Sequence, residues 1–142
     1  MQSFFRALSG AGHAVRRIVL GGTVTPQDRS ALGGWASTHC LEEEASGWTS
    51  HARDLATDAE IVVSAGPYGP PMLAAAVCED RPWFADVPGD PFAELHALEV
   101  VGDVPASRRA AAIRVALGTV SRADAFSVVS LPQHHALLGQ LA

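Results

Sequence analysis

Lysine and asparagine are absent from this chain, and cysteine and aromatic residues are sparse. The ten basic side chains are all arginine, and fifteen acidic residues outnumber them, for a formal charge of -5. Nucleic-acid binding requires a basic face, so this balance argues against nucleic acid as a partner. Cys40 and Cys78 are the only cysteines. Two cysteines far apart do not form a disulfide framework, and they favour a reducing, cytoplasmic setting.

Long apolar runs are missing too: none reaches the roughly 20 residues that cross a bilayer. The opening residues, MQSFFRALSGAG, lack the apolar core of an export signal. The histidines lack metal-ligand spacing, because His39 adjoins Cys40 and His134 adjoins His135. No G-x-S-x-G elbow indicates a serine hydrolase. We therefore expect no metal, no cofactor and no transmembrane segment.

The composition favours one globular domain spanning residues 1–142, with 48% hydrophobic and 18% charged residues. Short β-prone runs alternate with segments of helical spacing, although residues 23–44 give no clear element. Strands are predicted over 13–22, 61–63, 83–85 and 126–129, and helices over 4–9, 48–57, 70–77, 91–100, 106–120 and from 131 onward. This alternation predicts an α/β fold with a mainly parallel, two-sided sheet and right-handed crossovers.

The helix predicted over 106–120 has an apolar stripe at helical spacing. Its members are Ala110, Ile113, Leu117 and Val120. Such a stripe is typical of the face that a helix turns toward the core.

The most informative stretch is residues 59–94, where two predicted strands end in polar loops. The first ends in Gly66-Pro67-Tyr68-Gly69, directly before a predicted helix. Backbone amides at such a helix start are suited to an anion or to sugar hydroxyls, and Tyr68 is suited to stacking on a sugar. The loop is neither G-x-G-x-x-G nor a P-loop with lysine, so nucleotide binding is poorly supported. A plain tight turn is the structural alternative.

Two carboxylates, Asp86 and Asp90, follow the second strand around Val87-Pro88-Gly89. A carboxylate at a strand end is placed to act as a general base toward a ligand hydroxyl. Asp90 precedes Pro91, which is also typical of a helix N-cap. Asp86 has no such structural explanation and is the preferred catalytic candidate.

Ser130 and Gln133 have capping-box spacing after the last predicted strand. Capping of the final helix is the favoured interpretation. Binding of a ligand in a cleft is the alternative, because the same helix start lies at a strand end.

Several segments resemble GT-B-fold glycosyltransferases of the family-4-like branch. FRALSGAGHAVRRIVLGG resembles the first helix and second strand of their N-terminal domain, with its Gly-His-x-Val junction. VVSAGPYGPPMLAA, followed by RPWFADVPGDPFAE, resembles a strand with a small-residue loop and the next strand with its polar turn. ADAFSVVSLPQHHALLGQL resembles a later strand and helix. The resemblance implies a Rossmann-like, three-layer α/β/α domain on the acceptor side.

Two departures from that family accompany the resemblance. Its first strand with a Gly-rich loop has no counterpart before Phe4, and its C-terminal, donor-binding domain has none either. The resemblance therefore implies a partial N-terminal domain, incomplete at both ends and inactive alone. In the full-length protein, a nucleotide-sugar donor bound by the other domain would glycosylate an acceptor hydroxyl without an obligatory metal.

A non-catalytic Rossmann-like binding or interaction module is the alternative function. An α/β domain without its first strand exposes a sheet edge, and self-association through that edge is then expected. Peripheral contact with a membrane remains open.

Overall fold

The computed structural model describes residues 2–20, 36–41, 47–66, 69–102 and 105–141. Contacts divide the chain into two compact units, Met1–Leu55 and Ala56–Ala142. No helix in the described part of the chain combines the length and apolarity needed to cross a membrane. The expectation of one domain over residues 1–142 stays a prediction.

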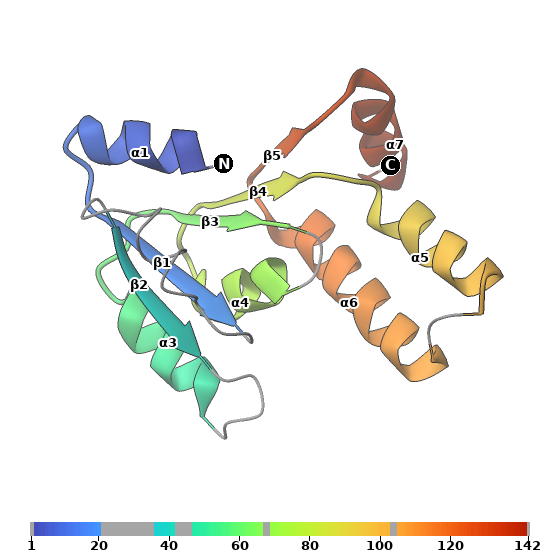
Figure 1. The fold of residues 1–142 in the computed structure, drawn as a ribbon, viewed down its shortest axis with the longest axis horizontal. Helices are drawn as coiled ribbons and strands as arrows, with labels where there is room; N and C mark the ends of the chain where they lie inside the picture. The colour runs from blue at the N-terminus through green and yellow to red at the C-terminus, as the bar shows by residue number, and fades with distance from the viewer. Residues whose placement is uncertain (1, 21–35, 42–46, 67–68, 103–104, 142) are drawn as a thin grey trace. The chain divides into compact units, whose positions relative to one another are not determined.

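The first unit contains two strands paired in parallel. Its elements are α1 (Gln2–Gly10), β1 (Val15–Leu20), β2 (Ala36–Leu41) and α3 (Trp48–Ala56). β1 and β2 lie side by side (Figure 1), with Val15 opposite Ala36 and Leu20 opposite Leu41. The side chain of Arg16 in β1 donates a hydrogen bond to the carbonyl of Leu55 near the end of α3. Three of these elements were predicted, but β2 was not.

The junction between α1 and β1 is closed by a glycine in the left-handed region. Gly12 has φ 92°, a conformation that costs glycine little and other residues more. His13 N–H donates to the carbonyl of Leu8 at 3.1 Å, and Gly12 N–H to that of Ser9 at 3.0 Å. This is a Schellman ending, and it explains why Gly-His directs the chain from helix into strand.

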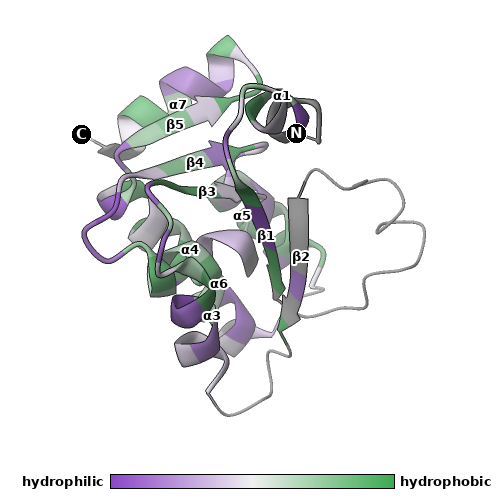
Figure 2. Cartoon of the chain, turned by 90° about the vertical axis from the view of Figure 1, so that its left-hand side faces the viewer, coloured by the Kyte–Doolittle hydropathy of each residue, from purple (hydrophilic) through white to green (hydrophobic). Residues whose placement is uncertain are grey.

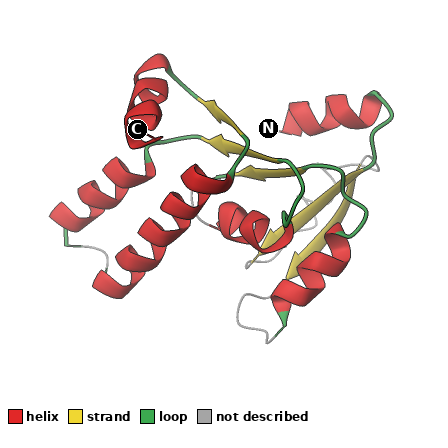
Figure 3. Ribbon diagram, turned by 180° about the vertical axis from the view of Figure 1, so that it is seen from behind, coloured by secondary structure: helices red, strands yellow, loops and turns green. Residues whose placement is uncertain are grey.

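The second unit is built on a three-stranded parallel sheet with the order β3-β4-β5 (Figures 1 and 3). Its strands are β3 (Val62–Ala65), β4 (Trp83–Val87) and β5 (Ala125–Val128). Its helices are α4 (Gly69–Val77), α5 (Pro91–Val100), α6 (Ala106–Arg122) and α7 (Leu131–Leu141). The predicted α/β class and parallel sheet are confirmed here, and all these elements lie within a few residues of their predicted bounds.

Two successive crossovers put α4 and α6 on the same face of this sheet. Right-handed crossovers that step in one direction along a sheet place their helices on one side of it. α4, with the sequence GPPMLAAAV, has no charged side chain and is hydrophobic over most of its length (Figure 2). It packs against α6.

The two faces of the sheet differ in burial. Alternation along β4 buries Trp83 and Ala85 and leaves Phe84 and Asp86 half-buried. Most of the buried side chains on helices belong to α4 and α6. We therefore infer that the buried residues of the strands lie on the face of the sheet that α4 and α6 cover. Asp86 therefore belongs to the opposite, less covered face.

A polar pair lies within the core of the second unit. Trp83 is the largest fully buried side chain among the described residues, with 1% of its surface exposed. Its indole N–H donates to the hydroxyl oxygen of Ser64 in β3 at 2.9 Å. Because both partners are buried, each satisfies a polar group that would otherwise be left without water.

The apolar stripe predicted for α6 coincides only in part with its buried face. Ile113 and Val120 are half-buried, but Ala110 is exposed and Leu117 is 53% exposed. The buried residues of α6 are Ala116 and Thr119. The Thr119 hydroxyl donates to the carbonyl of Val115 at 2.8 Å, so this polar residue can face the core. Small side chains toward the core allow α6 to pack closely, and they shift its buried face away from the one predicted from hydrophobicity alone.

Candidate functional site

The carboxyl ends of β3, β4 and β5 meet at one edge of the sheet, as expected for parallel strands. Asp86 is the penultimate residue of β4 and is half-buried. It lies opposite Ala65 in β3 and opposite Ser127 in β5. The Ser127 hydroxyl donates a hydrogen bond to Asp86 Oδ1. Asp86 is thus held at the edge where open α/β sheets bind ligands.

The loop after β3 begins at Gly66, which has φ 115° and continues the sheet pairing. Its N–H donates to the backbone carbonyl of Asp86 at 3.2 Å, so this amide is engaged by β4. Pro67 and Tyr68 lie outside the described residues. Gly69 begins α4, and the next two residues are prolines, which have no N–H to donate. Pro70 and Pro71 therefore cannot contribute to the predicted amide cradle, which stays a prediction because Pro67 and Tyr68 lie outside the described residues.

Asp90 is the N-cap of α5, as its position before Pro91 predicted. Its Oδ1 accepts hydrogen bonds from the N–H of Phe92 at 3.0 Å and of Ala93 at 3.1 Å. These amides have no partner within the helix, so the cap stabilises the first turn. The carboxylate has a complete structural role at this position, which makes Asp86 the stronger catalytic candidate.

Ser130 and Gln133 begin α7 as a capping pair. Ser130 Oγ accepts from the Gln133 N–H at 3.3 Å, and Gln133 Oε1 accepts from the Val129 N–H at 2.9 Å. The amide nitrogen of Gln133 also donates to the carbonyl of Val87 at 2.7 Å and to that of Gly89. Gln133 therefore ties the end of β5 to the loop after β4, and its polar atoms are engaged in the fold.

The cavity beside these residues is small. Asp90 and Gln133 line it with Val87, Val128 and Leu137, and its volume is about 10 Å³. A cavity of that size accommodates about one water molecule. The structure therefore brings Asp90 and Gln133 together without forming a sugar-sized pocket between them.

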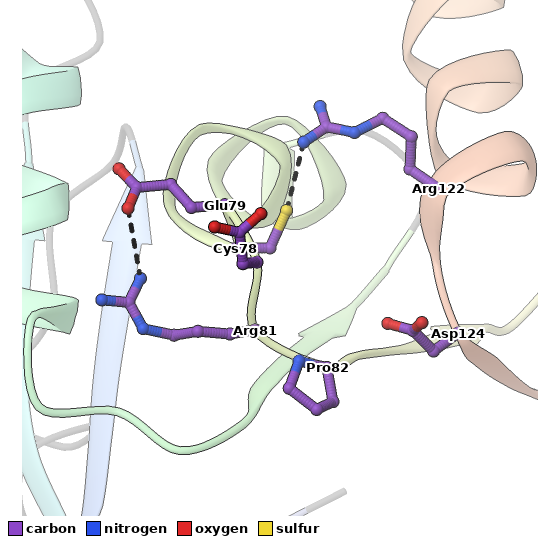
Figure 4. A pocket seen from close by; sticks show the side chains of 7 residues that line it. Cys78, Glu79, Arg81, Pro82, Arg122 and Asp124 are labelled. Atoms are coloured by element: carbon purple, nitrogen blue, oxygen red, sulfur yellow. Dashed lines mark hydrogen bonds and ion pairs between the residues drawn. The ribbon is translucent and has the colours of Figure 1, made fainter.

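A larger cavity of about 290 Å³ lies at the other end of the strands, beside the residues that precede β4 and β5 (Figure 4). Its lining is largely charged: Cys78, Glu79, Asp80, Arg81, Pro82, Arg122 and Asp124. Asp124 Oδ2 accepts the N–H of Trp83 at 2.8 Å, and the Asp124 N–H donates to the Trp83 carbonyl at 2.9 Å. Asp124 directly precedes β5, so these bonds extend the pairing of the two strands by one residue at the start of β5.

The arginines of this cavity are engaged by neighbouring groups. Arg81 donates to the carbonyl of Val77 at 2.8 Å, closing the end of α4, and to that of Thr57 at 3.2 Å. Arg122 donates to the sulfur of Cys78 at 3.2 Å (Figure 4). Cys78 is buried. We interpret this cavity as structural, because both of its arginines are engaged by groups of the same unit, and we place the candidate site at the carboxyl ends of the strands.

Ser127 is the residue of this site that the sequence did not predict. A polar residue inside the run AFSVV was a signal, but its meaning depends on strand register, which the sequence does not specify. Within the described residues, no group of three or more His, Cys, Asp or Glu side chains is placed to hold a metal ion.

Comparison with known proteins adds no assignment. No protein family, curated protein or solved structure matches this chain.

Proposed function

We propose that this chain is the acceptor-side, N-terminal domain of a GT-B-type glycosyltransferase acting in the cytoplasm. The observation that carries the proposal is the position of Asp86: a half-buried carboxylate at the carboxyl end of the middle strand of a parallel sheet. Ligands of open α/β sheets bind at such ends. The complete domain would be Rossmann-like and three-layered, with further chain completing the sheet.

In the proposed reaction, Asp86 is the general base. A hydroxyl oxygen of the acceptor bonds to the anomeric carbon of the donor sugar. The bond from that carbon to the diphosphate oxygen breaks, and the diphosphate leaves with the electron pair. Asp86 takes the hydroxyl proton as the new bond forms.

The donor would be held by a second Rossmann-like domain in the full-length protein. Closure of the two domains would exclude water and align the acceptor hydroxyl with the anomeric carbon. In this proposal the chain supplies the acceptor side, and the donor site belongs to the second domain. Binding without transfer is therefore the behaviour to test.

We expect the purified 142-residue chain to bind methyl α-D-glucopyranoside weakly and to transfer no sugar from UDP-glucose to it. In NMR titrations, amides around residues 65–66 and 86–88 should shift with the glycoside. Asp86→Asn should weaken binding by roughly tenfold or more, because an amide does not replace a charged acceptor of a hydroxyl hydrogen bond.

Asp90→Asn is the matched control for this experiment. Asparagine caps helices about as well as aspartate, so this variant removes a neighbouring carboxylate without loosening α5. Its binding should equal that of the unchanged chain. Equal binding by the Asp86→Asn variant, or transfer of glucose by the isolated chain, would contradict the proposal.

A non-catalytic interaction module is the second candidate, and the edge strand β5 favours it. Among the described strands, β5 pairs only with β4. Val129 and Leu131, which follow it, are 69% and 66% exposed. An open edge with apolar neighbours is a template for pairing with another chain.

If β5 mediates self-association, light scattering should show a mass that rises with protein concentration. Replacing both Val129 and Leu131 with lysine should abolish that rise, because two like charges would meet at the edge. Val100→Lys, at a 74% exposed position in α5, is the control and should leave the association unchanged. A concentration-independent monomer would exclude self-association through β5.

A further inference from the structure

The contact between Asp86 and Ser127 joins two strands far apart in sequence. The two residues are 41 positions apart and lie directly opposite each other in the register of β4 and β5. Opposed residues of neighbouring strands project from the same face of a sheet. Both are half-buried, so this hydrogen bond is partly shielded from water.

The hydrogen bond distinguishes the two oxygens of the Asp86 carboxylate. Oδ1 accepts the Ser127 hydroxyl proton, whereas Oδ2 has no hydrogen-bond or ion-pair partner among the described residues. A serine hydroxyl donating to a carboxylate forms a charge-assisted bond, which is stronger than a bond between neutral groups. The bond therefore restricts the rotation of the Asp86 side chain.

We infer that Ser127 is the positioning residue for Asp86, holding Oδ1 so that Oδ2 is the oxygen that receives the proton of the ligand hydroxyl. The inference rests on the proposed function of Asp86 as the base. Ser127 keeps its own proton throughout and exchanges none with the ligand. Its contribution is to hold the base in one orientation before the ligand arrives, which lowers the cost of reaching the reactive arrangement.

The orientation of Asp86 can be measured without any ligand. Three-bond Hα–Hβ couplings of Asp86 report whether its χ1 angle occupies one rotamer or averages over several. We expect one dominant rotamer in the unchanged chain and averaged couplings in Ser127→Ala. Ser127→Thr, which keeps the hydroxyl, should restore the single rotamer. Ser121→Ala, in an exposed part of α6, is the control and should change nothing.

A second variant covers the case in which Ser127→Ala does not fold. Ser127→Cys keeps a side chain of similar shape but donates only weakly, so it should give partial averaging of the Asp86 couplings. Unchanged couplings in both the alanine and cysteine variants would overturn the inference. So would averaged couplings in the threonine variant, because a bulk effect rather than the hydroxyl would then set the rotamer.

Titration with methyl α-D-glucopyranoside separates this inference from the function on which it rests. If the unchanged chain binds the glycoside, Ser127→Ala should weaken binding by roughly tenfold and Ser127→Thr should restore it. If the chain binds no glycoside but Asp86 still loses its rotamer in Ser127→Ala, the proposed function fails and the positioning of Asp86 stands. Weakened binding with unchanged couplings would overturn the positioning role alone.

Discussion

Replacing Trp83 with alanine is expected to unfold the unit Ala56–Ala142. Removing a fully buried aromatic side chain typically costs about 3–5 kcal/mol through lost burial and the cavity left behind. The same change leaves the buried Ser64 hydroxyl without its indole partner, at a further cost of about 1–3 kcal/mol. The sum approaches the whole stability of an ordinary domain, about 5–15 kcal/mol.

Hydrogen exchange followed by mass spectrometry is the measurement for this variant, because it reports each unit separately. Amides of β3, β4 and β5 should lose protection, whereas those of β1 and β2 form the internal reference. Trp48→Ala, at a half-buried position in α3, is the matched control and should leave the three-stranded sheet protected. Retained protection in the Trp83→Ala variant would show that the core does not depend on this side chain.

Two milder variants separate the volume of Trp83 from its hydrogen bond. Trp83→Phe keeps an aromatic ring but leaves the Ser64 hydroxyl unpaired. Adding Ser64→Ala to Trp83→Phe should recover part of the lost stability, since removing both polar partners costs less than leaving one unpaired. Equal stability of the single and double variants would mean that water reaches Ser64.

The second large effect is expected from Gln133→Ala, which should lower the free energy of unfolding by about 2 kcal/mol. Three backbone groups lose their partner in this variant: the carbonyls of Val87 and Gly89 and the N–H of Val129. Each net hydrogen bond contributes about 1 kcal/mol, and partial exposure reduces the sum. Urea denaturation followed by circular dichroism measures the change as a lower midpoint.

Ser130→Ala is the control for Gln133, because it removes only the capping hydroxyl of α7 and should cost about 1 kcal/mol. Gln133→Glu tests the donor role directly. It keeps an acceptor for the Val129 N–H but points an oxygen at two carbonyl oxygens, so it should be at least as destabilising as alanine. A harmless glutamate substitution would contradict the assigned hydrogen bonds.

The elements with local signals were predictable from the sequence. Asp90 before Pro91 specifies a helix start through groups within three residues, and Ser130 with Gln133 does the same for α7. Gly12 ends α1 for an equally local reason. In each case the atoms that decide the structure are neighbours in the chain.

The elements that depend on distant residues were not predictable. β2 contains Ser37, Thr38 and His39, which lack the apolar pattern of a strand, and its strand conformation accompanies pairing with β1. The pairing of Asp86 with Ser127 requires the register of two strands separated by α5 and α6. The contacts of Gln133 with Val87 and Gly89 were not predictable either. Capping-box spacing predicts the hydrogen bonds at the start of α7 and not those to another loop.

The sheet of the second unit also bears on how the chain folds during synthesis. The spatial order β3-β4-β5 is the order in which the strands leave the ribosome. Each new strand therefore joins an open edge, and none has to insert between two strands that are already paired. The β3–α4–β4 segment closes the shorter loop, so β4 has its first partner before α5 and α6 have been made. β5 then adds the third strand and the hydrogen bond to Asp86, so the candidate base becomes ordered only after α5 and α6 have been made.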